Sequence, residues 1–112
     1  MEKGDAIEGA RLFRTRCSHC HTIAKGGMHK GGPNLYGIYG APAGQAPWYM
    51  YSPANRNINV QWTHANLSSF LESPQTFMPG NKMSFRGLKD PQQRADLLAF
   101  LALQTDSAPK EQ

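Results

Sequence analysis

Apolar residues recur at the spacing of an α-helix near the start of the chain. The segment AIEGARLFRT at residues 6–15 follows Asp5, whose carboxylate can accept hydrogen bonds from the first free amide groups of a helix. One face of this segment, with the residue just beyond it, carries Ile7, Ala10, Phe13 and Cys17. The pattern predicts a helix of about ten residues with this face turned toward the core.

Two further helices are predicted in the second half of the chain. Thr63 can cap the segment HANLSSFLES at residues 64–73, and Pro74 stops that helix. Asp90 precedes Pro91, which suits the first position of a helix, and QQRADLLAFLAL follows. This last segment places three leucines on one face: Leu97, Leu98 and Leu101.

Turn-forming residues separate these helices. Glycine and proline dominate residues 26–47, and MPGNKMSFRG at residues 78–87 is also typical of a loop. Ser52 and Pro53 predict the start of one more short helix. Strand-like alternation of apolar and polar residues never exceeds three or four positions. The fold class is therefore predicted to be all-α, with three to five short helices.

Composition predicts a small domain that is stabilised by a bound group. The chain has 112 residues, of which 39% are hydrophobic, 11 are glycine and 8 are proline. A thin core of this kind usually needs disulfides, a metal or a cofactor, and the 2 cysteines allow one disulfide at most. We expect a single domain over residues 1–112, with frayed ends at Met1–Lys3 and Asp106–Gln112.

Charge and hydropathy exclude some classes of protein. The net charge of +4 indicates acidic partners, but no basic stripe indicates nucleic acid. No run approaches the roughly 18 apolar residues of a membrane span. The first residues, MEKGDAIEGA, lack the apolar region of a secretory signal. The chain is therefore either already processed or reaches its compartment without a cleaved signal.

Both cysteines lie in the stretch RCSHCHT at residues 16–22. A structural zinc site usually takes two pairs of ligands from separate segments, and no second pair exists here. A thioredoxin-like dithiol lies at the start of a long helix, whereas TIAKGGMHKGG follows this motif. A plain disulfide is a further alternative that the spacing does not favour.

The remaining interpretation is the C-x-x-C-H motif of c-type haem attachment, formed by Cys17, Cys20 and His21. Two thiols can add to the two vinyl groups of a porphyrin as thioethers, and one helical turn spans the distance between those groups. The adjacent histidine then lies beneath the iron as the proximal ligand. Ser18 and His19 are spacers in this motif.

The sixth ligand of such an iron has several candidates, which are Met1, Met28, Met50, Met78, Met83, His29 and His64. Methionine more often fills gaps in a core than binds a metal. Met78 and Met83 flank the rigid sequence PGNK, and Met83 is favoured because it lies within the loop. Histidine and methionine together close both axial positions, which suits electron transfer.

The chain resembles the class I cytochromes c of the mitochondrial type from Gly4 to about Thr105. The motifs that carry the resemblance are CSHCHT, KGGMHKGGPNLYG, GQAP at 44–47, YSPANRN at 51–57, Trp62, LESP at 71–74, PGNKMSFRGL at 79–88 and RADLLAFL at 94–101. This resemblance implies the small cytochrome c fold, with loops wrapped around one haem c that is covalently bound through Cys17 and Cys20.

The resemblance also implies roles for the residues of the haem pocket. His21 and Met83 would be the axial ligands, and the carbonyl of Pro33 would orient His21. Tyr51 and Trp62 would hydrogen-bond a buried haem propionate. Further pocket positions are Asn55 and Asn81, beside the distal water network, and Phe70, where a tyrosine is common. Gly9 would mark a close crossing of the first and last helices.

Some positions depart from the family pattern. Ala41 stands in the region where an arginine usually helps to neutralise the buried propionate. Gln75 and Thr76 replace two lysines of the usual docking face. The charges that remain to form this face are Arg16, Lys30, Lys82, Arg86 and Lys89.

The function implied by the resemblance is soluble one-electron transfer, not enzyme catalysis. The carrier would pass electrons from a cytochrome bc1-type complex to cytochrome c oxidase in the mitochondrial intermembrane space. It would be a monomer that docks on acidic faces of those complexes and contacts anionic membrane peripherally. The alternatives are a haem-based peroxidase-like or ligand-sensing protein, and a bacterial periplasmic cytochrome c of the same fold.

Overall fold

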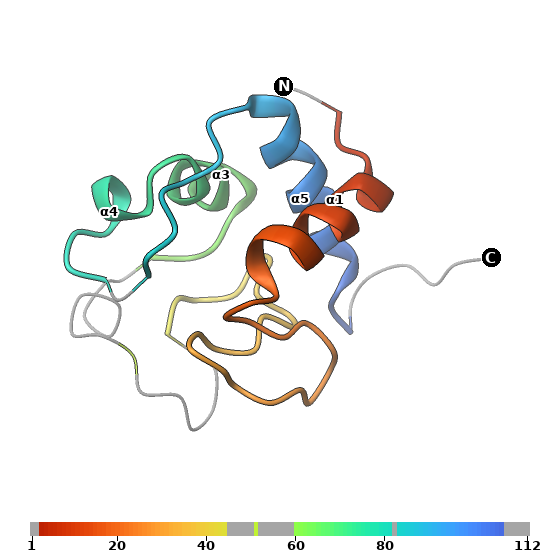
Figure 1. Ribbon diagram of the computed structural model, residues 1–112, viewed down its shortest axis with the longest axis horizontal. Coiled ribbons are helices and arrows are strands. Elements are labelled where there is room, and N and C mark those ends of the chain that lie inside the picture. The colour runs from red at the N-terminus through yellow and green to blue at the C-terminus, as the bar shows by residue number, and fades with distance from the viewer. Residues whose placement is uncertain (1–2, 45–50, 52–59, 82, 107–112) are drawn as a thin grey trace.

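The computed structural model describes residues 3–44, 51, 60–81 and 83–106 and consists of helices joined by long loops (Figure 1). The helices are α1 (Ala6–Leu12), the π-helix η1 (Phe13–Cys17), α3 (His64–Glu72), α4 (Pro74–Phe77) and α5 (Pro91–Leu103). The β-structure among these residues is one isolated bridge between Pro42 and Gln61. The predicted all-α class is confirmed.

The capping residues read from the sequence start three of these helices. The Asp5 carboxylate accepts hydrogen bonds from the first amide groups of α1, and the Thr63 hydroxyl accepts one from Asn66 in α3. Asp90 caps α5 in the same way, with Pro91 in the first turn. Pro74 differs from expectation, because it ends α3 and also begins the short helix α4. The helix expected after Ser52 lies outside the described residues.

Helix α1 changes register at its end. The amide of Ser18 donates to the carbonyl of Phe13, five residues earlier, at 2.8 Å. The wider turn leaves the Arg11 carbonyl to be bound by the Thr15 hydroxyl, at 3.0 Å. The predicted helix over residues 6–15 is therefore present, but its last part is a π-turn that ends at Cys17.

The buried face of α1 differs from the predicted one. Ile7 is 82% exposed, whereas Gly9, Leu12 and Phe13 are buried. Two residues along an α-helix correspond to a rotation of about 200°, so turning Gly9 toward the core turns Ile7 to solvent. The prediction that Ile7 faces the core is wrong, because the crossing with α5 sets the orientation of α1.

Glycine permits that crossing. A Cβ atom on Gly9 would lie 1.9 Å from the carbonyl oxygen of Asp96 and 2.7 Å from the Cβ of Phe100. The phenyl rings of Phe13 and Phe100 pack with their centroids 5.8 Å apart. The backbones of α1 and α5 therefore approach too closely for any side chain at this position. This agrees with the close crossing that the resemblance predicts at Gly9.

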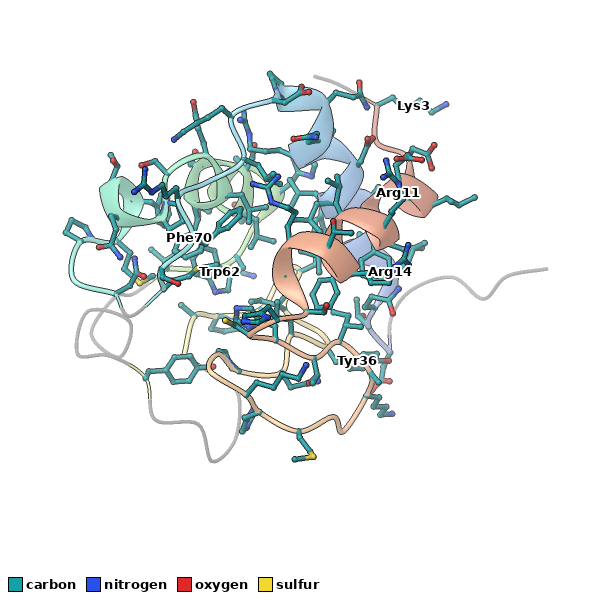
Figure 2. The ribbon with its side chains drawn as sticks, in the orientation of Figure 1. Lys3, Arg11, Arg14, Tyr36, Trp62 and Phe70 are labelled. Atoms are coloured by element: carbon teal, nitrogen blue, oxygen red, sulfur yellow. The ribbon has the colours of Figure 1, made fainter. Side chains whose placement is uncertain are left out.

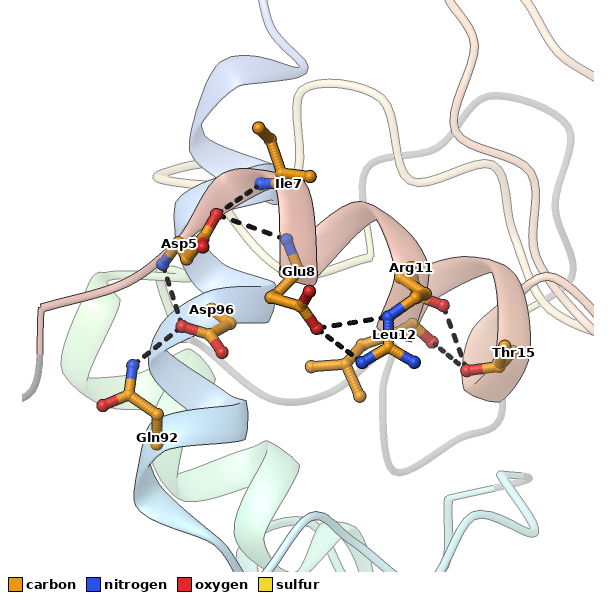
Figure 3. A network of polar contacts seen from close by, with 8 residues as sticks. All are labelled: Asp5, Ile7, Glu8, Arg11, Leu12, Thr15, Gln92 and Asp96. Carbon is orange, nitrogen blue, oxygen red and sulfur yellow. Dashed lines mark hydrogen bonds and ion pairs between the residues drawn. The ribbon is translucent and has the colours of Figure 1, made fainter.

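A buried carboxylate adds polar contacts to the same crossing (Figure 3). Asp96 is 7% exposed, and its Oδ1 accepts hydrogen bonds from the Asp5 amide and the Gln92 side chain, both at 2.8 Å. Gln92 also donates to the carbonyl of Lys3, at 2.8 Å. These contacts hold Lys3 and Asp5 against α5.

The C-terminal side of α5 is held in a similar way. Asp106 accepts a hydrogen bond from the Tyr36 hydroxyl at 2.9 Å and forms an ion pair with Lys25 at 2.9 Å. Leu97, Leu98 and Leu101 are buried, as predicted, and belong to one core cluster with Phe13 of η1 and with Leu67 and Leu71 of α3.

No helix within the described ranges has the length and apolar character needed to cross a membrane.

Replacing Gly9 by alanine tests the crossing. Gly9→Ala should lower the free energy of unfolding of the haem-loaded protein by about 3 kcal/mol, since the added methyl overlaps backbone atoms of α5. Alanine regains about 1 kcal/mol of helix propensity, which is too little to offset this overlap. The control Ile7→Ala should change stability by less than about 0.5 kcal/mol. Guanidinium denaturation measures both values, and equal effects of the two substitutions would contradict the crossing.

Candidate functional site

A cavity of about 730 Å³ lies between the helices and the loop that follows η1, which is drawn in orange and yellow below the helices in Figure 1. Every pocket residue expected from the sequence and described by the structure lines this cavity. These residues are Cys17, Cys20, His21, Pro33, Tyr51, Trp62, Phe70, Asn81 and Met83. Asn55 lies outside the described residues.

The two cysteines share one turn at the end of η1. The amides of Cys20 and His21 both donate to the carbonyl of Cys17, each at 3.0 Å, so the three side chains come from one tight turn. Burial raises the pKa of the Cys17 thiol to about 11, against a smaller opposing effect of the Arg16 charge. A redox-active dithiol requires a lowered pKa instead. The environment of Cys17 therefore disfavours the dithiol interpretation.

His21 presents one ring nitrogen to the cavity. Its Nδ1–H donates to the carbonyl of Pro33 at 2.8 Å, which fixes the ring and leaves the lone pair on Nε2. Burial lowers the pKa of His21, so the imidazole is held in its neutral, metal-binding form. A Cβ atom on Gly32 would lie 2.2 Å from the imidazole Cε1, so the ring packs directly on the Gly32 backbone.

Met83 is the only methionine of the described part of the chain that lines the cavity. Met78, the alternative on the other side of PGNK, is 2% exposed and belongs to the core, whereas Met28 is 78% exposed. His64 hydrogen-bonds the Tyr39 hydroxyl at 2.9 Å and lies outside the cavity lining. The geometry thus favours the thioether of Met83 over these alternatives as a ligand opposite His21.

Asn81 has a backbone-binding role that sequence reasoning missed. Its Oδ1 accepts a hydrogen bond from the Met83 amide at 2.7 Å. Its Nδ2 donates to the carbonyls of Pro74 at 3.0 Å and Met78 at 2.8 Å. The available signal was its place after Pro-Gly, since asparagine side chains often bind nearby backbone in turns. Asn81 therefore shapes the loop that positions Met83.

Trp62 places a buried donor on the cavity. Its side chain is 5% exposed and packs edge-on against Phe70, with ring centroids 5.1 Å apart (Figure 2). Its indole N–H has no hydrogen-bond acceptor in the part of the chain that the structure describes. Buried donors are rarely left unpaired, so an acceptor on a bound group is expected here. A haem propionate supplies such an acceptor, and the apolar cavity with its thiols, imidazole and thioether fits the rest of a haem.

The comparison with known proteins agrees with this site. A family model described as cytochrome c matches residues 6–104. The chain belongs to the cytochrome c family. It is 49% identical over 98 residues to a cytochrome c of Gossypium barbadense, covering 88% of each chain. It is 50% identical over 101 residues to a cytochrome c of Theileria parva, covering 90% of this chain and 87% of the relative. A cytochrome c of Cochliobolus lunatus is 45% identical over 105 residues, which covers 94% of this chain and 97% of the relative.

Cytochromes c of the mitochondrial type carry a covalent c-type haem and transfer electrons, and this chain is of that type. Cys17 and Cys20 form the cysteine pair of this family, with His21 next to them. The zinc and disulfide interpretations of the motif are thereby replaced. The cavity that both cysteines and His21 line is where this haem would lie.

The charges expected to dock a partner are spread unevenly around this cytochrome c cavity. Arg16 is exposed, lines the cavity, and places its guanidinium 5.7 Å from the ring centroid of Phe85. Lys30 donates to the carbonyl of Ser18 at 2.7 Å, next to the cysteine motif. Lys89 instead donates to the carbonyl of Glu72, at the end of α3, away from the cavity lining. Arg86 is exposed, and Lys82 lies outside the described residues.

Ala41 lies where a positive charge could balance a haem propionate. Ala41 lines the cavity and its carbonyl accepts the Trp62 amide at 2.7 Å. Among the described residues of the cavity lining, Arg16 is the only arginine or lysine. The side of the cavity near Trp62 therefore has no cation from this set to balance a propionate.

A cation introduced at Ala41 should raise the reduction potential. Ala41→Arg places a positive charge beside the propionate, which favours ferrous over ferric iron. We expect an increase of tens of millivolts, since about 59 mV corresponds to a factor of ten for one electron. The neutral control Ala41→Gln should leave the potential within about a third of that shift. Redox titration measures both, and a potential that stays constant or falls in Ala41→Arg would mean that the propionate is neutralised by other residues.

Proposed function

We propose that this chain is a diffusible one-electron carrier in which His21 and Met83 are the two axial ligands. The observation that carries the proposal is that both residues line one cavity, together with both cysteines. When bound, the haem supplies an iron that cycles between Fe(II) and Fe(III). If both His21 and Met83 held the iron, it would have no position left for a substrate, which favours a carrier over a catalyst.

Different residues of the chain would hold different parts of the haem. Cys17 and Cys20 would anchor it, and the carbonyl of Pro33 accepts the Nδ1–H of His21, which leaves Nε2 free to bind the iron. Trp62 donates its unpaired indole N–H to a propionate. The apolar walls exclude water, which limits the reorganisation that accompanies electron transfer. A single domain over residues 1–112 is sufficient for this function.

The proposed route runs from a cytochrome bc1-type complex to cytochrome c oxidase in the mitochondrial intermembrane space. The net charge of +4 suits a monomer that docks on acidic faces and contacts anionic membrane peripherally. The same fold and site would also serve in a bacterial periplasm. A peroxidase-like or ligand-sensing function would require an open sixth position, which the placement of Met83 does not favour.

Optical spectroscopy tests the ligation. The ferric protein should show the weak long-wavelength absorption band of a methionine–iron bond, and Met83→Ala should abolish it. Met28→Ala should leave the band unchanged, because Met28 is exposed and does not line the cavity. If the wild type lacks the band, or if it persists in Met83→Ala, then Met83 is not the sixth ligand.

Electron transfer to an acidic partner should depend on salt and on Arg16. Weak electrostatic docking suits a carrier that must leave quickly, and screening over about 8 Å at physiological salt should slow association as ionic strength rises. Arg16→Glu should lower the bimolecular rate at low salt several-fold, since Arg16 lies at the cavity.

Lys3→Glu is the matched control, with the same change in charge. Lys3 lies far from Trp62 and Phe70 in Figure 2, so its reversal should have little effect on the rate. Stopped-flow kinetics at several ionic strengths measures both variants. A rate that is indifferent to salt, or equally sensitive at the two positions, would show that docking uses another face.

A further inference from the structure

One exposed side chain binds the backbone of the loop that ends at Met83. Gln75 lies on α4, and its Nε2 donates to the carbonyls of Asn81 at 3.0 Å and Met83 at 3.2 Å. Its Oε1 accepts a hydrogen bond from the amide of Gly80 at 3.3 Å. Both ends of one carboxamide are therefore used at once, and all three contacts are to backbone of the same loop.

Only a carboxamide can make this set of contacts. Glutamine offers two N–H donors and an acceptor on one short planar group, whereas lysine offers donors without an acceptor, and glutamate offers acceptors without a donor. The resemblance to the family predicts only that Gln75 stands where a lysine of the docking face is usual, so that one docking charge is missing. The structure gives the glutamine a function of its own, which a lysine could not reproduce.

The helix that carries Gln75 provides a fixed anchor. Pro74 is fully buried, and its carbonyl accepts the side-chain amide of Asn81 at 3.0 Å. The amide of Leu88, beyond the loop, donates to the carbonyl of Leu71 in α3 at 2.7 Å. Pro79 and Gly80 themselves are exposed, and the hydrogen bonds from Gln75 and Asn81 join the described part of this loop to α4.

We propose that Gln75 is a positioning residue for the sixth ligand. Its carboxamide holds the loop closed over the cavity, and breaking its three hydrogen bonds is part of the cost of moving Met83 away from the iron. Gln75 thereby sets the rate at which the iron becomes accessible to an external ligand. This inference rests on the proposed function in one respect, which is the ligation by Met83.

The rate of loop opening can be measured with imidazole as an external ligand. At saturating imidazole, its binding to the ferric protein is limited by departure of Met83. Gln75→Ala should raise this limiting rate about tenfold, as expected for the loss of several weak exposed hydrogen bonds. Gln75→Glu keeps the acceptor for the Gly80 amide but places a carboxylate against the carbonyls of Asn81 and Met83. The limiting rate of this variant should therefore be at least as high as that of Gln75→Ala. Amide hydrogen exchange at Met83 should rise with the limiting rate in both variants.

Thr76→Ala is the matched control on the same helix. The Thr76 hydroxyl accepts a hydrogen bond from the Ser73 hydroxyl at 2.8 Å, and loop opening leaves this contact intact. Thr76→Ala should therefore lower global stability in denaturant without raising the limiting rate or the exchange at Met83. If Gln75→Ala and Gln75→Glu match the wild type, or if Thr76→Ala speeds opening equally, the positioning role of Gln75 is wrong.

The two proposals fail in different ways. If Met83 is not the sixth ligand, the wild type lacks the methionine band and binds imidazole without a limiting rate. Exchange at the Met83 amide still reports loop closure in that case, and its increase in Gln75→Ala would support the contacts made by Gln75. If the band is present but neither Gln75 variant changes the limiting rate, ligation by Met83 stands and the inference about Gln75 fails alone.

Discussion

The rest of the structure depends on one hollow, the cavity of about 730 Å³ that the helices and loops enclose. Apolar side chains that line a cavity of this size lose the burial that stabilises a small domain unless another group covers them. A domain of this size has a stability of only about 5–15 kcal/mol. The chain is therefore a shell whose core is completed by the haem of its family, and the residues on the cavity act as the inner surface of that core.

Contacts outside the cavity position the residues on its two sides. The crossing of α1 and α5 at Gly9 fixes the helix that continues through η1 to Cys17. On the other side, Asn81 and Gln75 fold the loop that brings Met83 to the cavity. The first arrangement rests on buried backbone contact, and the second on the partly buried hydrogen bonds of Asn81 and the exposed ones of Gln75. We therefore expect the segment that carries Met83 to open more readily than the crossing of α1 and α5.

Local chemistry made much of the fold and site predictable from the sequence. Asp5, Thr63 and Asp90 act on amides a few residues away, and the C-x-x-C-H motif needs only one turn. The features that could not be predicted depend on how segments fold against one another. The exposure of Ile7 follows from the position of α5, and the role of Gln75 follows from how the loop folds back on α4. Helical spacing alone does not distinguish a π-turn from an α-turn at Cys17.

The dependence of the fold on the haem is tested most directly by removing both anchors. The double variant Cys17→Ala/Cys20→Ala, freed of haem, should lose most of its far-ultraviolet circular dichroism at 222 nm, the helical signal. It should also lack a cooperative thermal transition, because the apolar side chains that line the cavity would no longer be covered by the haem. A haem-free variant that retains the helical signal and unfolds cooperatively near the melting temperature of the haem-loaded protein would contradict this account.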